Sequence, residues 1–204
     1  MVIKNFIVFE GIDGAGTTTQ LKRLAHNLGE QNVWTTAEPT DAETGRFLRR
    51  MLRGEFSVTE ETAAYLFAAD RCEHIFGKGG VKEQAESGKI VLCDRYFFSS
   101  LAYQSVSCGK DLPALLNSPF PLPELLLYFK IDPQISLSRV EKRGGTKEIY
   151  EKLEFQRRTA ALYDQVMSEY KGSKGSGMNL VEVDAAATMD DIEAFILKTV
   201  QAIR

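Results

Sequence analysis

The sequence has little of what marks several large classes of protein. Three cysteines, Cys72, Cys93 and Cys108, lack CxxC spacing, so we expect reduced thiols rather than a disulfide or a zinc site. The longest N-terminal apolar run is too short for a signal peptide or a membrane span, which favours a cytoplasmic protein without a membrane partner. With a net charge of −3, the chain does not have the excess of Lys and Arg that is typical of nucleic-acid-binding proteins. The two histidines, His26 and His74, are expected on helix surfaces or in helix packing.

What the sequence does contain is a regular alternation of strand and helix patterns. With 204 residues, of which 44% are apolar, it fits a single α/β domain over 1–204. Every gap between the apolar runs holds a helical pattern, which predicts a parallel five-stranded sheet covered by helices on both faces. The segment 109–124, with four of the six prolines, is expected to be a surface connection. The five apolar runs are 5–10, 33–37, 90–94, 125–131 and 180–184.

A glycine-bounded loop follows the first apolar run and precedes an amphipathic helix. It fits the phosphate-binding pattern G-x-x-x-x-G-K-[ST] except that Thr17 replaces the lysine. Its backbone N–H groups and the helix dipole suit a polyphosphate, and Thr18 would supply a hydroxyl for Mg²⁺. Thr17 removes the ammonium that normally reaches the β- and γ-phosphates. The loop residues are Gly11, Ile12, Asp13, Gly14, Ala15, Gly16, Thr17 and Thr18.

The third apolar run ends in an acid and a base, Asp94 and Arg95. Carboxyl ends of parallel strands share one edge of a sheet, so this pair is expected beside the phosphate loop. Asp94 could hold Mg²⁺ or one of its waters, and Arg95 could bind phosphoryl oxygens during transfer. Taken alone, these two residues could equally well form a structural ion pair at the end of the strand.

Two helical patterns carry side chains suited to a nucleotide. Phe67 and Arg71 are four residues apart and could offer an aromatic plane to a base and a guanidinium to its carbonyl oxygens. A core Phe beside a surface Arg is the commoner meaning of such a pair. A second pattern repeats the four-residue spacing with polar side chains, which favours a ligand over packing alone. These side chains are Ser99, Ser100, Tyr103 and Gln104.

Two further basic segments have both a functional and a plain interpretation. Four arginines within 46–53 could form a solvated helix face or bind an anion. The charged region 139–158 contains Gly144-Gly145, a possible hinge, and a mobile lid over about 139–151 could close on the transferring phosphate and deliver an arginine. A plain exposed loop would have the same composition. The lid candidates are Arg139, Lys142, Arg143 and Lys147.

Taken together and in order, these motifs resemble the thymidylate kinase family over about residues 5–170. The family's FEGIDGxGKxTQ corresponds to 9–20 with only the lysine missing, LLFxADR to 65–71, and DRYxxSSxAYQ to 94–104 without a gap. The resemblance implies a P-loop NTPase-like fold and an enzyme that transfers the γ-phosphoryl group of ATP to dTMP with Mg²⁺. It also implies a homodimer.

The resemblance assigns roles to single residues. Phe67 would stack on thymine and Arg71 would contact the base. Tyr103 would crowd the ribose 2′ position, and Asp13 would lie near the 3′-hydroxyl. Counting on from Glu38-Pro39 without a gap, Arg49 falls on the arginine that binds substrate phosphate. The implied substrate-binding set is Asp13, Glu38, Arg49, Phe67, Arg71, Arg95, Ser99, Tyr103 and Gln104.

Departures from the family pattern all concern phosphate-binding positions. The family's REPGGT is here AEPTDA, and Ile149 stands where arginine is often found, so Arg143 is expected to be the catalytic arginine in preference to Arg139. Lys142, Lys147 or Arg143 could replace the loop lysine, whereas Lys22 is a weaker candidate because it lies more than a turn into the helix. Two alternatives remain: a nucleotide-binding protein that has lost its chemistry, and a kinase for another nucleotide or a nucleoside.

Overall fold

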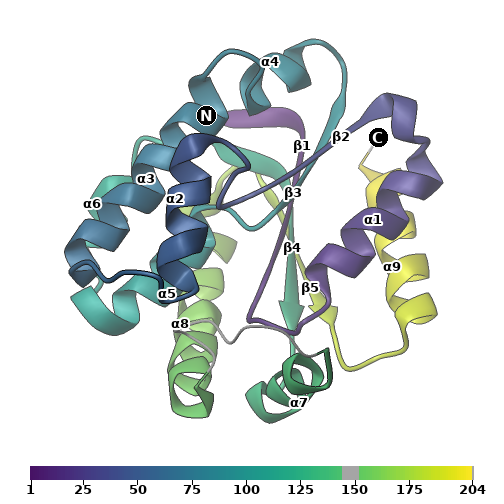
Figure 1. Cartoon of the computed structure of the whole chain (residues 1–204). Coiled ribbons are helices and arrows are strands. Elements are labelled where there is room, and N and C mark those ends of the chain that lie inside the picture. The colour runs from purple at the N-terminus through teal and green to yellow at the C-terminus, as the bar shows by residue number, and fades with distance from the viewer. Residues whose placement is uncertain (144–151, 204) are drawn as a thin grey trace.

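The computed structural model describes residues 1–143 and 152–203, which form a five-stranded parallel sheet between two layers of helices (Figure 1). The strand order is β2-β3-β1-β4-β5, and all neighbouring strands are parallel. The predicted sheet is confirmed. The strands are β1 Val2–Gly11, β2 Val33–Ala37, β3 Ile90–Asp94, β4 Leu122–Lys130 and β5 Asn179–Asp184.

Helices cover both faces of this sheet, with α1 and α9 on one side and α3, α5 and α8 on the other (Figure 1). The central strand β1 is apolar on both faces, and Phe6, Ile7, Val8 and Phe9 are at most 2% exposed. A continuous apolar run is what a strand between two helical layers requires. The helices are α1 Thr17–Leu28, α2 Glu43–Leu52, α3 Glu60–Phe76, α4 Val81–Glu86, α5 Phe97–Cys108, α6 Asp111–Asn117, α7 Pro133–Arg143, α8 Leu153–Lys171 and α9 Met189–Ala202, with short 3₁₀ turns η1 Glu30–Asn32 and η2 Ser173–Gly175.

The proline-rich segment 109–124 differs from the expected surface connection. It contains helix α6 and the beginning of β4, because Pro113 lies in the first turn of α6, where its missing N–H costs no hydrogen bond. Asn117, the last residue of α6, is buried and accepts a hydrogen bond from Arg71. The segment therefore contributes to the interior.

The carboxyl ends of β1, β2 and β3 meet at one edge of the sheet. Phe9 of β1 is in register with Asp94 of β3, which is in register with Ala37 of β2. Backbone hydrogen bonds extend this register past the strands: Arg95 N donates to Phe9 O at 2.9 Å, and Glu38 N donates to Asp94 O at 3.0 Å. The phosphate loop, the segment that begins at Glu38 and the Asp94–Arg95 turn thus begin side by side.

Cys72, Cys93 and Cys108 are free thiols. Burial raises the pKa of the Cys93 thiol well above its usual value, so it stays protonated. Within 1–143 and 152–203, no helix has the length and apolar character needed to span a membrane.

Candidate active site

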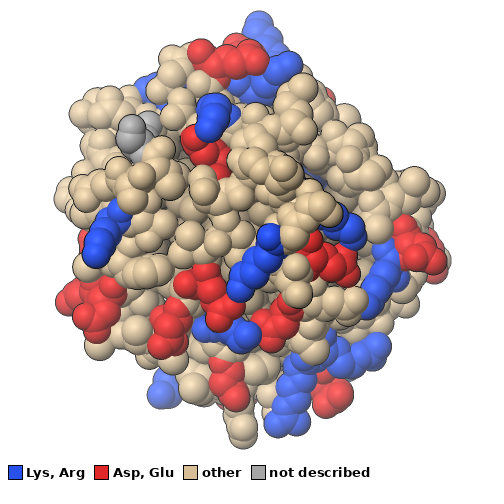
Figure 2. All heavy atoms as spheres, turned by 180° about the vertical axis from the view of Figure 1, so that it is seen from behind, with Lys and Arg blue, Asp and Glu red and all other residues tan. Residues whose placement is uncertain are grey.

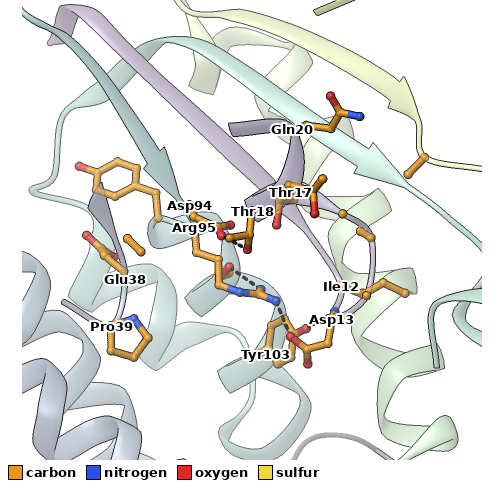
Figure 3. Close-up of a pocket in the computed structure, with 18 of the residues that line it drawn as sticks. Ile12, Asp13, Thr17, Thr18, Gln20, Glu38, Pro39, Asp94, Arg95 and Tyr103 are labelled. Carbon is orange, nitrogen blue, oxygen red and sulfur yellow. Dashed lines mark hydrogen bonds and ion pairs between the residues drawn. The ribbon is translucent and has the colours of Figure 1, made fainter. Parts of the chain in front are cut away.

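A cavity of about 540 Å³ opens at the carboxyl edge of the sheet and contains nearly all predicted site residues (Figure 3). Two are exceptions. Gly11 lies at the end of β1, where an added Cβ would approach Phe129 O to 2.9 Å, so it serves strand packing. Arg143 ends α7, and its side chain lies outside the described part of the chain, as do residues 144–151 of the predicted lid. The predicted residues in the wall are Ile12, Asp13, Gly14, Ala15, Gly16, Thr17, Thr18, Glu38, Arg49, Phe67, Arg71, Asp94, Arg95, Ser99, Tyr103 and Gln104.

The phosphate loop is shaped by two glycines in the left-handed region, Gly14 at φ 84° and Gly16 at φ 97°. An added Cβ at Gly14 would lie 2.4 Å from Ser136 O, because α7 packs directly on the loop. Helix α1 begins at Thr17 without a side-chain cap. Its first N–H groups therefore remain available for an anion, as in other helix N-termini that bind phosphate.

Thr18 and Asp94 form an oxygen-rich corner beside the loop. Thr18 Oγ1 donates a hydrogen bond to Asp94 Oδ2, while Asp94 Oδ1 is buried without a partner among the described residues (Figure 3). Hydroxyl and carboxylate oxygens are ligands that Mg²⁺ prefers, and this ion usually takes one or two protein carboxylates together with phosphates and water. The pair fits Mg²⁺ in that manner. Thr17 lines the same cavity and brings no charge.

Arg95 lies at the centre of the cavity in a strained backbone conformation, with φ at 73°. Its Nη1 donates to Gly11 O at 3.0 Å and to Ser99 Oγ at 3.2 Å, and its Nη2 forms an ion pair with Asp13 (Figure 3). The guanidinium also lies over the ring of Tyr103, 5.2 Å from its centroid. The strained turn and these contacts direct a fixed cation into the cavity.

Asp13 is held from three elements. Besides Arg95, its Oδ2 accepts a hydrogen bond from Gln156 of α8 at 2.9 Å, and its backbone N donates to the Tyr103 hydroxyl at 3.2 Å. Burial raises the pKa of Tyr103, so the phenol is neutral and its hydroxyl can accept this bond. Sequence reasoning missed Gln156, whose neighbours in the chain belong to an ordinary helix.

A buried glutamate in β1 orders the residues that follow Arg95 in the chain. Glu10 is fully buried and accepts hydrogen bonds from Tyr96 N at 2.8 Å, from Ser99 N at 3.1 Å and from the hydroxyls of Ser99 and Tyr163. It replaces the side-chain cap that the N-terminus of α5 lacks. Burial raises the pKa of Glu10, and the nearby Arg95 charge opposes this. An acid within an apolar strand was the sequence signal for such a network.

The opposite end of the cavity contains Phe67 and Arg71. Arg71 is 1% exposed, so it is not the surface arginine that the pattern alone left possible. Its Nε donates to Glu38 Oε2 at 2.8 Å, and its two Nη atoms donate to Asn117 and Ser100. Phe67 is half-buried in the same wall.

Glu38 lies behind Arg71 in a chain of buried contacts. Its Oε1 is 2.9 Å from His74 Nδ1, and His74 Nε2 is 2.7 Å from Thr36 Oγ1. Both carboxylate oxygens of Glu38 are therefore occupied by protein partners. His74 is buried. Its place in the sequence did not indicate that it would contact Glu38.

Arg49 reaches the cavity from α2. Its Nη2 donates to Pro39 O, while its Nε has no partner among the described residues. The start of α2 is fixed by Asp70, which accepts from Thr40 N at 2.8 Å and from the hydroxyls of Thr40 and Thr44 at 2.6 Å. Asp70 thus orders a turn in which AEPTDA replaces the glycine-rich family motif.

The far side of the phosphate loop has a wall formed by Arg139, a lid candidate, and by the segment after β5, which sequence reasoning did not assign to the site. Arg139 Nη1 donates to Ala185 O at 3.0 Å, and Gln20 Nε2 donates to Met189 O at 2.8 Å. These residues and the segment after β5 line the cavity beyond Gly14 to Thr18. The signal was available, because this segment also follows a parallel strand at the same edge.

Comparison with known proteins agrees with this arrangement. A family model described as thymidylate kinase matches residues 9–196. A putative thymidylate kinase of Treponema pallidum is 37% identical over 204 residues, covering 100% of this chain and 98% of the relative. A probable thymidylate kinase of Pyrococcus horikoshii is 37% identical over 205 residues, covering 96% and 95% of the two chains. A thymidylate kinase of Leptospira interrogans is 39% identical over 170 residues, covering 79% and 81%.

Proposed function

This chain belongs to the thymidylate kinase family, and on that premise we propose that it transfers the γ-phosphoryl group of ATP to dTMP, giving dTDP and ADP. One observation carries the proposal: a single cavity has the phosphate loop at one end and the Phe67–Arg71 wall at the other, with Arg95 between them. Such a cavity can hold a triphosphate and a nucleoside monophosphate with their phosphates facing each other.

The donor end is supported by the free N–H groups at the start of α1. These groups bind the ATP phosphates, and Thr18 with Asp94 holds Mg²⁺. When bound, the ion neutralises charge on the β- and γ-phosphoryl oxygens. Asp13 and Arg95 fix the loop relative to the acceptor, because their ion pair joins β1 to the turn after β3.

The acceptor end is supported by the buried network around Arg71. Phe67 stacks on the thymine ring, and the spare N–H groups of Arg71 and the amide of Gln104 contact the base. Tyr103 closes the sugar side, while Arg95 and Arg49 bind the dTMP phosphate. Glu38 and Ser99 act on the substrate through Arg71 and Arg95, since their own oxygens already have protein partners.

The chemistry needs no general base, because the acceptor phosphate is already an anion at neutral pH. Catalysis comes from alignment of the two phosphates and from cations that neutralise the charge. We assign the catalytic arginine of the lid at 139–151 to Arg143. Arg139 is less suited, because its guanidinium already donates to Ala185 O.

The remaining parts of the proposal concern partners and location. We propose a homodimer located in the cytoplasm, and the dimer is supported by an exposed apolar stripe on α3, where Tyr65 and Phe76 are 56% and 53% exposed. Neither nucleic acid nor membrane is proposed as a partner. On the face seen in Figure 2, Lys and Arg side chains are interspersed with Asp and Glu rather than gathered into one basic patch.

A coupled assay of ADP release tests the activity. The protein is supplied with ATP and Mg²⁺, and the acceptors dTMP, dUMP, dCMP and AMP are compared with a control without acceptor. We expect turnover that depends on dTMP. Binding of dTMP in calorimetry without turnover would support instead a nucleotide-binding protein that has lost its chemistry, and turnover with another acceptor alone would change the substrate.

A further inference from the structure

The phosphate loop lacks its lysine, and Lys22 stands in a position to replace it. Lys22 lies four residues after Thr18 and therefore on the same face of α1. Side chains of a helix lean toward its N-terminus, so Lys22 covers the turn that contains Thr18. One turn rises about 5.4 Å, roughly the span of the four-carbon stem of lysine. A residue more than a turn into α1 can therefore deliver its ammonium at the level of the loop.

A second cavity has Lys22 in its wall. We name it the side chamber: it has a volume of about 550 Å³ and is lined by Lys22, Trp34, Ala37 and Lys78, among others. Its wall also includes Thr18, Arg49 and Asp94, which line the active-site cavity as well. Ala37 also lines both cavities. The side chamber therefore reaches the Thr18–Asp94 corner.

The charge of Lys22 is not committed elsewhere within 1–143 and 152–203. Lys22 is exposed and has no hydrogen bond or ion pair there, whereas the adjacent Arg23 pairs with Asp190 and Glu193 of α9 at 2.8 and 2.7 Å. Asp94 presents a buried oxygen without a partner at the shared wall. An ammonium at this wall is attracted by the phosphates of a bound nucleotide, while Thr18 and Asp94 keep the Mg²⁺ assigned to them.

We propose that Lys22, acting through the side chamber, contacts the β- and γ-phosphoryl oxygens of bound ATP and supplies the charge that Thr17 removes from the phosphate loop. The inference rests on the proposed kinase function and adds a catalytic residue to it. Placing the cation on the Asp94 side of the nucleotide, rather than over the loop, makes position 17 free to carry a small neutral side chain.

The test compares four variants by turnover and by nucleotide affinity. We expect Lys22→Met to lower kcat about a hundredfold, as the loss of one transition-state charge contact commonly does. Its KM for dTMP should change less than threefold. In calorimetry with Mg²⁺, the β,γ-imido analogue of ATP should bind about tenfold more weakly, while AMP binding stays unchanged. Lys198→Met is the matched control, an exposed helical lysine that lines neither cavity.

Rescue separates this role from a structural one. In the double variant Thr17→Lys with Lys22→Met, the restored loop lysine should return kcat to within about tenfold of the wild-type value, which a mere loss of stability would not allow. A kcat for Lys22→Met within threefold of wild type would overturn the inference, as would a larger loss in Lys78→Met. If the wild type shows no turnover with dTMP, the proposed function fails, and the affinity for the imido analogue alone decides the role of Lys22: a tenfold loss supports it and an unchanged affinity overturns it.

Discussion

The two ends of the active-site cavity hold their arginines in opposite ways. At the base end the Arg71 side chain is 1% exposed, and its donors bind Glu38, Asn117 and Ser100. At the phosphate end, taken here as the part of the cavity that would hold the dTMP phosphate, the Arg49 side chain is 39% exposed, and its partners within 1–143 and 152–203 are Pro39 O and, at 3.4 Å, the exposed Asp41. At the base end each nitrogen of the Arg71 guanidinium has a protein partner, whereas Nε of Arg49 has none among the described residues. We call Arg71 and its partners the closed network.

This difference indicates how each end meets its ligand. A side chain already fixed by several hydrogen bonds loses little conformational entropy on binding, so the base end is preorganised. The phosphate end must bind the groups that move during transfer, and long side chains with free donors can follow them. It is also the end at which the sequence departs from the family pattern. The residues that bind the base must therefore be fixed before the ligand arrives, whereas those that bind phosphate must be able to move with it.

The largest effect is expected from breaking the closed network. Arg71→Met leaves the Glu38 carboxylate buried beside His74 without its guanidinium partner. Removing one member of a buried ion pair costs about 3–5 kcal/mol, so the free energy of unfolding in urea should fall by that amount. Arg50→Met is the control, because its pair with Glu55 is solvent-exposed and its loss should leave the free energy of unfolding nearly unchanged. Equal losses in the two variants would contradict the closed network.

The next effect concerns Arg95, which joins the two ends. Arg95→Met should lower kcat/KM for dTMP by about a hundredfold or more, because it removes the cation between the two phosphates. The affinity for the β,γ-imido analogue of ATP should change less, since the N-terminus of α1 stays intact. Steady-state kinetics with varied dTMP, combined with calorimetry, measure both quantities. An equal loss of analogue affinity would place Arg95 on the donor phosphates instead.

A smaller effect is expected at the adaptable end. Arg49→Met should raise KM for dTMP about tenfold with little change in kcat, and should alter the free energy of unfolding by less than about 1 kcal/mol, because few protein contacts are lost. Arg46→Met on the same helix is the matched control, since its exposed pair with Glu43 lies outside the cavity. A stability loss like that of Arg71→Met would erase the contrast between the ends.

Sequence patterns predicted the parts of this protein that are continuous in the chain. The strands and the phosphate loop could be placed because apolar runs, glycines and hydroxyls follow one another directly. The contact of Glu38 with His74 could not, since it joins residues 36 positions apart and no periodicity relates them. The burial of Asn117 could not be predicted for a similar reason. The prolines of segment 109–124 indicate a turn, whereas the burial of Asn117 depends on Arg71 of another helix.

The smallest and most specific expectation concerns Glu10, beneath the junction of the two ends. Burial raises its pKa, so between the ordinary value near 4.5 and its value in the fold the native state binds more protons than the unfolded state. Stability contributed by Glu10 is therefore greatest below pH 4.5 and falls as the pH rises through that window. Glu10→Gln removes the titration while keeping the size of the side chain.

The free energy of unfolding, measured in urea from pH 4 to pH 8 for wild type and Glu10→Gln, should show a difference that shifts in favour of the variant as the pH rises. Tyr163→Phe is a useful companion, since it removes one donor to Glu10 but keeps the carboxyl group, and so should retain the pH dependence. A difference that shifts toward the wild type would mean that the four donors outweigh burial. Glu10 would then belong, like Arg71, to a closed network of charges stabilised by its partners.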